Sequence, residues 1–282
     1  MRENKIAIMA DSGCDIPNFL LNKHKIYRIP YYLVCKDKTY KDTAISLTDL
    51  YRLMENEKPV TTLPDHAEVL KILRVIREHG YQKVLSITIA SHQSGMYDLL
   101  RQHTQSQKGL EMEVIDSCNI SLGAGMLAIN AAEYLEQDLP WDALKERLLK
   151  DVKTSKAFFC LKTLKYLRQN TKIGPISAFL GDSLNIKPIL TCDSKGINTT
   201  KIKALGYKQA LPRLSESVQH FTTANSLQIA VMHGAAEQEA TRVKERVLAQ
   251  LPQAKLVLEG PISPVLAVHS GPGLVGIAVM SG

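Results

Sequence analysis

Apolar runs and amphipathic stretches alternate along the first half of the chain. Apolar residues gather in residues 5–10, 26–35, 83–89 and 111–115, which predicts buried strands. Between these runs apolar residues recur at helical spacing, which predicts helices at 47–55, 64–79, 94 onward, 125–136 and 140–153. Strands that alternate with helices favour a mostly parallel sheet with helices on both faces.

The pattern changes near residue 153. Beyond it the predicted strands are 157–160, 186–191, 227–231, 254–258 and 274–279, and the predicted helices are 162–168, 176–182, 206–221 and 236–251. We therefore predict an α/β protein of two domains, residues 1–153 and a smaller mixed α/β domain at residues 154–282. No low-complexity linker separates them, so we expect the two parts to pack closely.

The composition is typical of a globular protein, with 282 residues of which 45% are apolar and 22% charged. The 35 Lys and Arg exceed the 28 Asp and Glu by 7, but the basic residues are scattered and form no nucleic-acid-binding motif. No apolar run reaches the roughly 18 residues of a membrane span, and the first residues do not form a secretory signal. The five cysteines lack CxxC spacing, so we expect reduced thiols and a cytoplasmic protein. Because the basic residues are scattered, we expect no nucleic-acid partner.

Two glycine patterns suggest a nucleotide site. Residues 271–276 fit GxGxxG, but only six residues follow, too few to complete a dinucleotide-binding unit. Gly123 and Gly125 open a predicted helix after a strand, so a small-anion or nucleotide site at this loop stays open beside simple close packing. The eight histidines contain no HExxH pattern, and we expect no metal.

A serine hydrolase is a second alternative. Ser94, Asp116 and His269 follow the chain order of an α/β-hydrolase triad, although Ser94 has no GxSxG elbow. An acyl hydrolase or esterase that uses Ser94 and His269 is therefore kept as an alternative function.

Hydroxyl groups stand where predicted helices begin. Thr61 and Thr62 precede one helix, Ser91 follows a strand and Ser94 begins the next helix. Free N–H groups and the helix dipole at such positions favour a carboxylate or phosphate. Ordinary capping by Thr61 or Thr62 and by Ser94, worth about 1 kcal/mol per helix, is the simpler explanation from position alone.

Six motifs in order and spacing give the chain a resemblance to the DegV family, the fatty-acid-binding subunits of bacterial fatty acid kinases. They are residues 11–17 (DSGCDIP), 61–64 (TTLP), 90–97 (ASHQSGMY), 114–125 (VIDS with GAG), 167–190 (ending in SLNIKPIL) and 269–273 (HSGPG). They are similar to the family's DSxxDLP, TSQP, SGTY, VxDS with GxG, GGRI with LNIKPIL, and HTGPG.

The resemblance implies a two-domain fold with a fatty acid, expected to be C14–C18, between the domains. Thr61 or Thr62 and Ser94 would hydrogen-bond its carboxylate, Gly95 would add a backbone N–H, and His269 would stand behind the head group. The chain would present this carboxylate to a separate ATP-dependent kinase and hold the acyl phosphate for transfer. The protein itself would be no enzyme and need no cofactor, and its basic surface would touch the membrane transiently.

The apolar tail needs a slot, for which we predict Ile176, Phe179, Leu180, Leu184, Ile189 and Leu266. Three positions depart from the family pattern. Lys172 occupies the position of the arginine in GGRI. Unlike arginine, lysine cannot make a bidentate contact with a partner or head group. Met96 removes the hydroxyl of SGTY, and Leu63 replaces the glutamine of TSQP.

Overall fold

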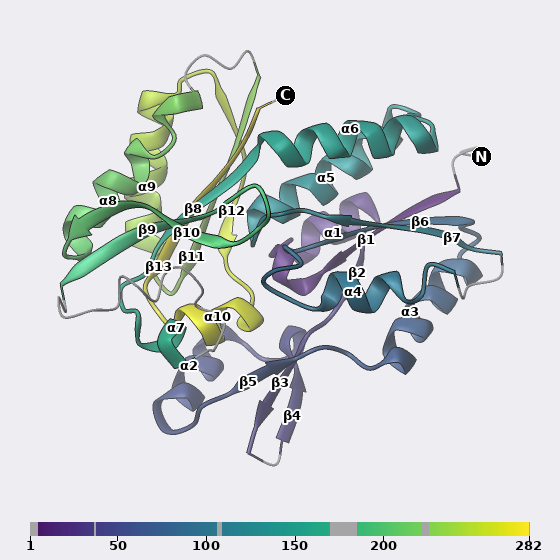
Figure 1. Ribbon diagram of the computed structural model, residues 1–282, viewed down its shortest axis with the longest axis horizontal. Coiled ribbons are helices and arrows are strands. Elements are labelled where there is room, and N and C mark those ends of the chain that lie inside the picture. Colours follow the sequence, from purple (N-terminus) through teal and green to yellow (C-terminus); the bar gives the residue numbers. More distant parts are fainter. Residues whose placement is uncertain (1–4, 37, 106–108, 170–184, 222–225, 282) are drawn as a thin grey trace.

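The computed structural model describes residues 5–36, 38–105, 109–169, 185–221 and 226–281. Strands in these residues form three sheets, accompanied by helices on either side (Figure 1). The predicted α/β class is confirmed. Within the described residues, none of the helices has the length and apolar character needed to span a bilayer.

A parallel sheet forms the centre of the first half. It consists of β1 (Ile6–Asp11), β2 (Tyr27–Ile29), β6 (Lys83–Thr88) and β7 (Glu111–Asp116), in the order β2-β1-β6-β7. All three strand pairs are parallel, and every residue of β1 is buried. The carboxyl ends of these strands therefore meet at one edge, where their following loops lie.

Helices cover both faces of this sheet, as the alternating pattern predicts. In Figure 1, α5 and α6 lie on one side and α3 and α4 on the other. The described helices of this half are α1 (Asn18–His24), α2 (Leu47–Asn56), α3 (His66–Glu78), α4 (Met96–Arg101), α5 (Leu122–Glu136) and α6 (Trp141–Thr154). Two short 3₁₀ turns, η1 (Ser12–Cys14) and η2 (Asp42–Ala44), follow β1 and β4.

A small antiparallel sheet interrupts the first half and is absent from the prediction. It has the order β4-β3-β5, with β3 (Tyr32–Cys35), β4 (Lys38–Lys41) and β5 (Val60–Thr62). The single strand expected at 26–35 divides into β2 and β3, which belong to different sheets. Pro30 lies between them and has no N–H to continue a ladder. The other strands are too short and too exposed to give a clear apolar signal.

The second half is built on a six-stranded sheet of order β10-β9-β8-β13-β11-β12. Its strands are β8 (Ser155–Cys160), β9 (Ile186–Cys192), β10 (Asn198–Leu205), β11 (Leu227–Gly234), β12 (Ala254–Pro261) and β13 (Leu274–Ser281). β11 and β12 pair in parallel and the other pairs are antiparallel, so the sheet is mixed.

The helices of the second half depart further from the prediction. They are α7 (Lys165–Gln169), α8 (Tyr207–Glu216), α9 (Glu237–Gln250) and α10 (Pro264–Ser270), with the turn η4 (Gln219–Phe221). α8 ends earlier than expected, and neither α10 nor β10 is predicted. β10 is a partly exposed edge strand of mixed polarity, so its sequence does not show the clear alternation of apolar and polar residues that would predict a strand. The helix predicted at 176–182 lies outside the described residues.

Helix α5 joins the two halves because it is apolar on nearly all sides. It contacts β1 and β6 of the parallel sheet and also β8, β11 and β13 of the larger sheet. One hydrophobic cluster accordingly includes β1, α5 and inward residues of β8 and β13, such as Phe159 and Met280. A second cluster lies under α8 and α9. The larger sheet begins at Ser155, but the core is shared, and the domain division at 153/154 stays a prediction.

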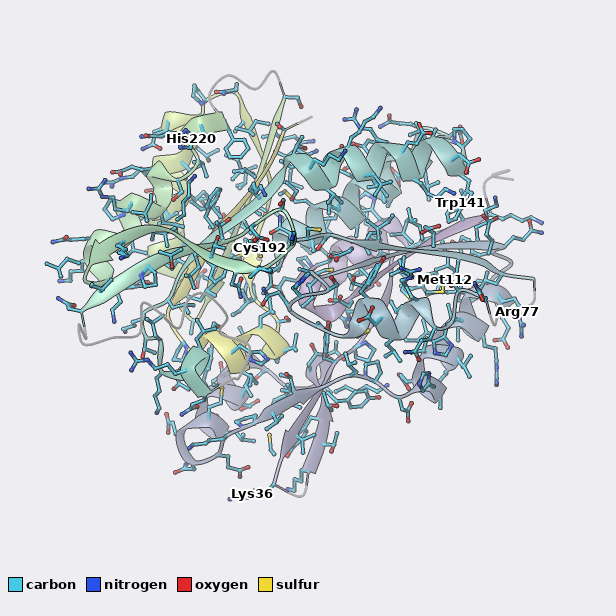
Figure 2. The ribbon with its side chains drawn as sticks, viewed as in Figure 1. Lys36, Arg77, Met112, Trp141, Cys192 and His220 are labelled. Atoms are coloured by element: carbon cyan, nitrogen blue, oxygen red, sulfur yellow. The ribbon has the colours of Figure 1, made fainter. Side chains whose placement is uncertain are left out.

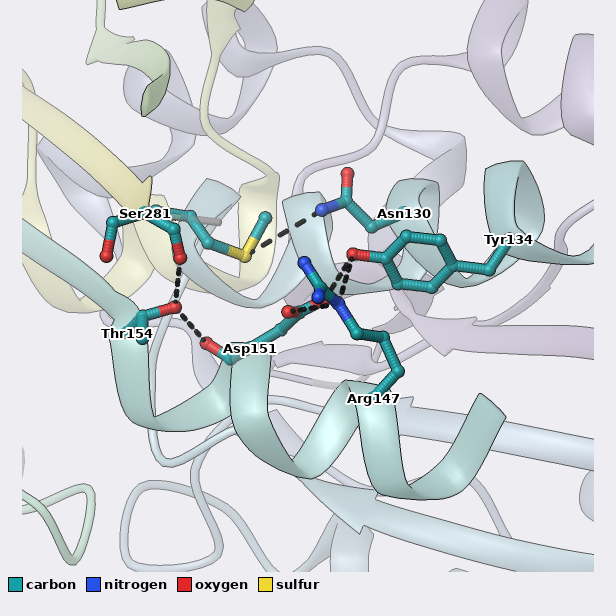
Figure 3. Close-up of polar contacts among 7 residues, drawn as sticks. Asn130, Tyr134, Arg147, Asp151, Thr154 and Ser281 are labelled. Carbon is teal, nitrogen blue, oxygen red and sulfur yellow. Dashed lines mark hydrogen bonds and ion pairs between the residues drawn. The ribbon is translucent and has the colours of Figure 1, made fainter. Parts of the chain in front are cut away.

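Polar contacts connect α6 to α5 and to the end of β13 (Figure 3). Tyr134 of α5 donates a 2.7 Å hydrogen bond to Asp151 of α6, and Arg147 forms a 3.2 Å ion pair with the same carboxylate. At the end of α6, the Thr154 hydroxyl donates to the carbonyl of Ser281 at 2.6 Å. These contacts fix the end of β13 against the helical layer of the first half.

Glycine in α5 permits a close approach that any side chain would block. A Cβ on Gly125 would lie 2.3 Å from the carbonyl oxygen of Cys14, and one on Gly123 would lie 2.6 Å from the Asn119 side chain. Both glycines therefore contact the protein itself, which favours close packing over a nucleotide site at this loop.

We predict that Gly125→Ala destabilises the protein by about 1–3 kcal/mol, because the new methyl group must displace backbone. Alanine is a better helix former than glycine, so helix propensity alone would make Gly125→Ala more stable. The sign of the change in the free energy of unfolding therefore tests the packing directly. Urea unfolding measures the change. Gly260→Ala is the control, since nothing lies within 4 Å of its Cβ position. Equal or greater stability of Gly125→Ala would contradict the packing described here.

Candidate functional site: a cavity between the two halves

A cavity of about 560 Å³ lies where the carboxyl edge of the parallel sheet faces the larger sheet and α10. Most of its wall is apolar, formed by Val60, Leu63, Ile89, Ile120, Phe159, Leu161, Leu167, Met232, Ile262, Val265, Leu266 and Leu274. Its polar lining comprises Tyr31, Thr61, Thr62, Gln93, Ser94, Ser121, Asn198, His269 and Ser270. An apolar space with a few polar groups suits a ligand with one polar end.

Ser94 lies in the loop that follows β6, buried but facing the cavity. Its hydroxyl oxygen accepts a 2.6 Å hydrogen bond from the Tyr31 hydroxyl and a 3.1 Å bond from the backbone N–H of Met96. A hydroxyl has two acceptor lone pairs and one donor hydrogen. Both lone pairs are therefore used, and the remaining capacity of Ser94 is to donate.

Tyr31 fixes this arrangement and is missed by sequence reasoning. Its backbone N–H donates to the Ser12 hydroxyl and to the Asp42 carboxylate, each at 3.1 Å. Burial raises the pKa of the Tyr31 hydroxyl well above its ordinary value, so the phenol keeps its proton. The only local signal is its place after Pro30, where the predicted strand breaks.

Thr61 and His269 meet across the cavity from distant parts of the chain. Thr61 lies on β5 and His269 in the last turn of α10, and Thr61 Oγ1 lies 2.9 Å from His269 Nε2. A Cβ on Gly95 would lie 3.2 Å from Leu63 Cδ1, so the end of β5 also adjoins the Ser94 loop. The structure thus gathers Thr61, Thr62, Ser94, Gly95 and His269 around one cavity.

Neither helix is capped by the expected residue. The N-cap of α3 is Asp65, whose carboxylate accepts a 2.8 Å bond from the N–H of Glu68. Thr61 and Thr62 belong to β5 instead, so capping does not explain them. The N-cap of α4 is Gly95, and Ser94 serves the helix only through its bond from Met96.

Three buried carboxyl groups support the loops behind the cavity. Asp11 accepts a 2.8 Å bond from the N–H of Ile89, and Asp15 accepts a bond from the Ser121 hydroxyl and a 2.7 Å bond from the N–H of Ser263. Burial raises the pKa of Asp11 and of Asp15 to about 7 and that of Asp42 to about 6. Among the described residues, no group of side chains is suited to hold a metal ion.

The residues of the hydrolase alternative do not form a triad. The described hydrogen bonds of the Ser94 hydroxyl reach Tyr31 and Met96, and neither group is a base at neutral pH. Asp116 accepts from the N–H groups of Ser91 and Cys118, and His269 is paired with Thr61. A serine nucleophile needs an adjacent base held by a third group, which this arrangement does not provide.

The predicted acyl-chain slot is only partly described. Leu266 lines the cavity. Ile189 is fully buried in the second hydrophobic cluster and is not among the described lining residues, because its strand turns it toward α8. Lys172, Ile176, Phe179, Leu180 and Leu184 lie outside the described residues. Sequence reasoning also missed Phe159, Met232 and Leu274, which read as ordinary core residues of strands.

Of the departures from the family pattern, Met96 is fully buried at the start of α4 and is absent from the described cavity lining. Leu63, by contrast, belongs to the lining, so its replacement of glutamine makes the wall more apolar.

The sequence model of the family described as uncharacterised proteins of the DegV family matches residues 5–282. The chain belongs to the DegV family. A DegV domain-containing protein of Clostridium acetobutylicum is 32% identical over 276 residues, which cover 98% of each chain.

Solved structures agree with this membership. A structure described as showing fatty acid binding of a DegV family protein from Thermus thermophilus superimposes with a TM-score of 0.92 and 26% identity over 100% of both chains. The structure of DegV, described as a fatty acid binding protein from Bacillus subtilis, gives a TM-score of 0.88 and 26% identity, covering 98% of this chain and 99% of that one.

The raised pKa values predict a pH dependence of stability. Between an ordinary carboxyl pKa of 3.8 and the folded values near 6 to 7, the folded state binds more protons than the unfolded chain. Stability therefore falls as pH rises through this window. We expect the native protein to lose more stability between pH 5 and pH 8 than Asp42→Asn, measured by urea unfolding at each pH. Glu55→Gln, at an exposed carboxylate, should lose as much stability over this pH range as the native protein. The same loss in Asp42→Asn would contradict the account.

Proposed function

We propose that this chain binds a long-chain fatty acid of about C14–C18, with its carboxylate at Ser94 and its hydrocarbon tail along the apolar wall. The observation that carries this proposal is the Ser94 hydroxyl, whose two acceptor positions are filled and whose hydrogen is left for a ligand in the cavity. Thr61, Thr62 and His269 add polar groups for the second oxygen, and Gly95 adds a backbone N–H.

The apolar wall supplies the affinity. Each buried CH₂ contributes about 0.8 kcal/mol before the costs of association, so a long chain binds strongly without charged partners. A cavity of about 560 Å³ lies within the usual range for small-molecule sites. The structurally similar proteins of Thermus thermophilus and Bacillus subtilis are fatty-acid-binding proteins, which supports the same ligand class here.

We further propose that the protein presents this carboxylate to a separate ATP-dependent fatty acid kinase and then holds the acyl phosphate for an acyltransferase. Family membership supports this role. A site in which none of the described hydrogen bonds joins the Ser94 hydroxyl to a base supports it as well. In this proposal the protein works in the cytoplasm, and its net charge of +7 aids transient contact with anionic membrane or with the kinase. Lys172, outside the described residues, remains the predicted partner or head-group contact.

Ser94→Ala should weaken binding of palmitate by about 1–3 kcal/mol, roughly 5- to 150-fold, because the carboxylate loses a hydrogen-bond donor. Isothermal titration of delipidated protein measures the affinity, and native mass spectrometry of the untreated protein shows whether a fatty acid co-purifies. Ser91→Ala is the control, since Ser91 lies in the same loop but does not belong to the described cavity lining.

Two results would contradict the proposed function. Native protein that carries no fatty acid and takes up none of the C14–C18 acids would exclude the ligand class. Labelling by a serine-directed fluorophosphonate that disappears in Ser94→Ala would instead favour the acyl hydrolase. We expect no Ser94-dependent labelling, because its oxygen is engaged by Tyr31 and Met96.

A further inference from the structure

The turn between β9 and β10 is stiffened from within. The Asp193 carboxylate accepts hydrogen bonds from the N–H groups of Lys195 and Ile197, at 2.8 and 3.0 Å. The N–H of Gly196 donates to the Asp193 carbonyl at 3.1 Å. The side chain and backbone of Asp193 thus fix the internal shape of the turn. Where the turn lies relative to the rest of the protein is then set by its contacts with neighbouring loops.

This turn packs on the loops at the carboxyl edge of the parallel sheet. Gly196 has a φ of +79°, and a Cβ there would lie 2.5 Å from Ala90 Cβ and 3.3 Å from Cys118 Cα. Ala90 belongs to the loop after β6 and Cys118 to the loop after β7. Figure 2 labels Cys192, the last residue of β9, where the two halves of the molecule meet. A residue without a side chain permits this close approach.

The side-chain amide of Gln93 connects the same loop to the turn. Gln93 Nε2 donates to the carbonyl of Gly196 at 2.8 Å, and Gln93 Oε1 accepts from Asn198 Nδ2 at 2.8 Å. Gln93 directly precedes Ser94, and Gln93, Ser94 and Asn198 all line the cavity. The two bonds therefore run across the wall of the cavity, from the first half to the second, beside the proposed head-group donor.

We propose that Gln93, with Gly196 and Asn198, forms a clamp that holds the Ser94 loop on the larger sheet and sets how long a bound fatty acid stays. This inference rests on the proposed function. Gln93 is a positioning residue: it fixes the loop that carries the donor, and it closes the cavity wall at the junction of the two halves. Breaking both bonds frees the loop to move away from β10, which opens a path for the ligand.

The experiment measures release of bound radiolabelled palmitate to excess fatty-acid-free albumin, together with the melting temperature of each delipidated protein. Gln93→Leu removes both bonds and should speed release by about tenfold or more. Gln93→Glu keeps the size of the side chain and the acceptor for Asn198, but it turns a carboxylate oxygen toward the Gly196 carbonyl. At pH 8 it should therefore release palmitate as fast as Gln93→Leu does. A merely space-filling role would leave Gln93→Glu at the native rate.

Two further variants sharpen the result. Asn198→Ala should also speed release, and the double variant with Gln93→Leu should be no faster than Gln93→Leu alone, because both act on one clamp. Ser91→Ala, in the same loop but outside the described cavity lining, is the control and should keep the native rate. All variants should melt close to the native temperature.

The outcomes separate the clamp from the proposed function. Native protein that loads palmitate while both Gln93 variants release it at the native rate would overturn the clamp and leave the proposed function standing. Faster release only in proportion to a lower melting temperature would overturn it too, since that indicates general loosening. Native protein that binds no palmitate would overturn both.

Discussion

The packing of helix α5 determines where the two halves of this protein meet. The helix is buried on nearly every side, against the parallel sheet on one side and against β8, β11 and β13 on the other. Gly125 lets it approach the backbone of Cys14 more closely than any side chain would allow. Because both sheets share this one helix, the carboxyl edge of the parallel sheet faces the larger sheet at a fixed distance, and the cavity lies between them.

The chemistry of the cavity follows from this placement. Loops at the carboxyl edge bring Ser94 from the first half, and α10 brings His269 from the second. Tyr31 and the Met96 N–H fill both acceptor positions of Ser94, so the remaining hydrogen-bonding capacity of this hydroxyl is to donate. Buried carboxyl groups at Asp11, Asp15 and Asp42 organise the backbone behind the site rather than facing it. The result, among the described residues, is a polar cluster in which the Ser94 hydroxyl bonds Tyr31 and Met96 rather than a base, set in an apolar wall.

The sequence predicted most of this architecture where the apolar pattern was strong. The strands β1, β6 and β7, the helices α3, α6 and α9, and five of the six strands of the second sheet follow from periodicity. The small sheet β4-β3-β5 did not, because its strands are three or four residues long and partly exposed. The candidate head-group residues came from short motifs shared with the DegV family, whereas Tyr31 and Gln93 escaped notice. Their roles depend on contacts with Ser94 and with the β9–β10 turn, and such distant contacts leave no local pattern.

A crystal structure of the protein loaded with palmitate tests the central claim most directly. The account predicts a carboxylate oxygen within hydrogen-bond distance of Ser94 Oγ, roughly 2.6–3.2 Å, with the acyl chain along Phe159, Met232 and Leu274. A fatty acid bound elsewhere, or one whose carboxylate lies at the opposite end of the cavity from Ser94, would contradict it.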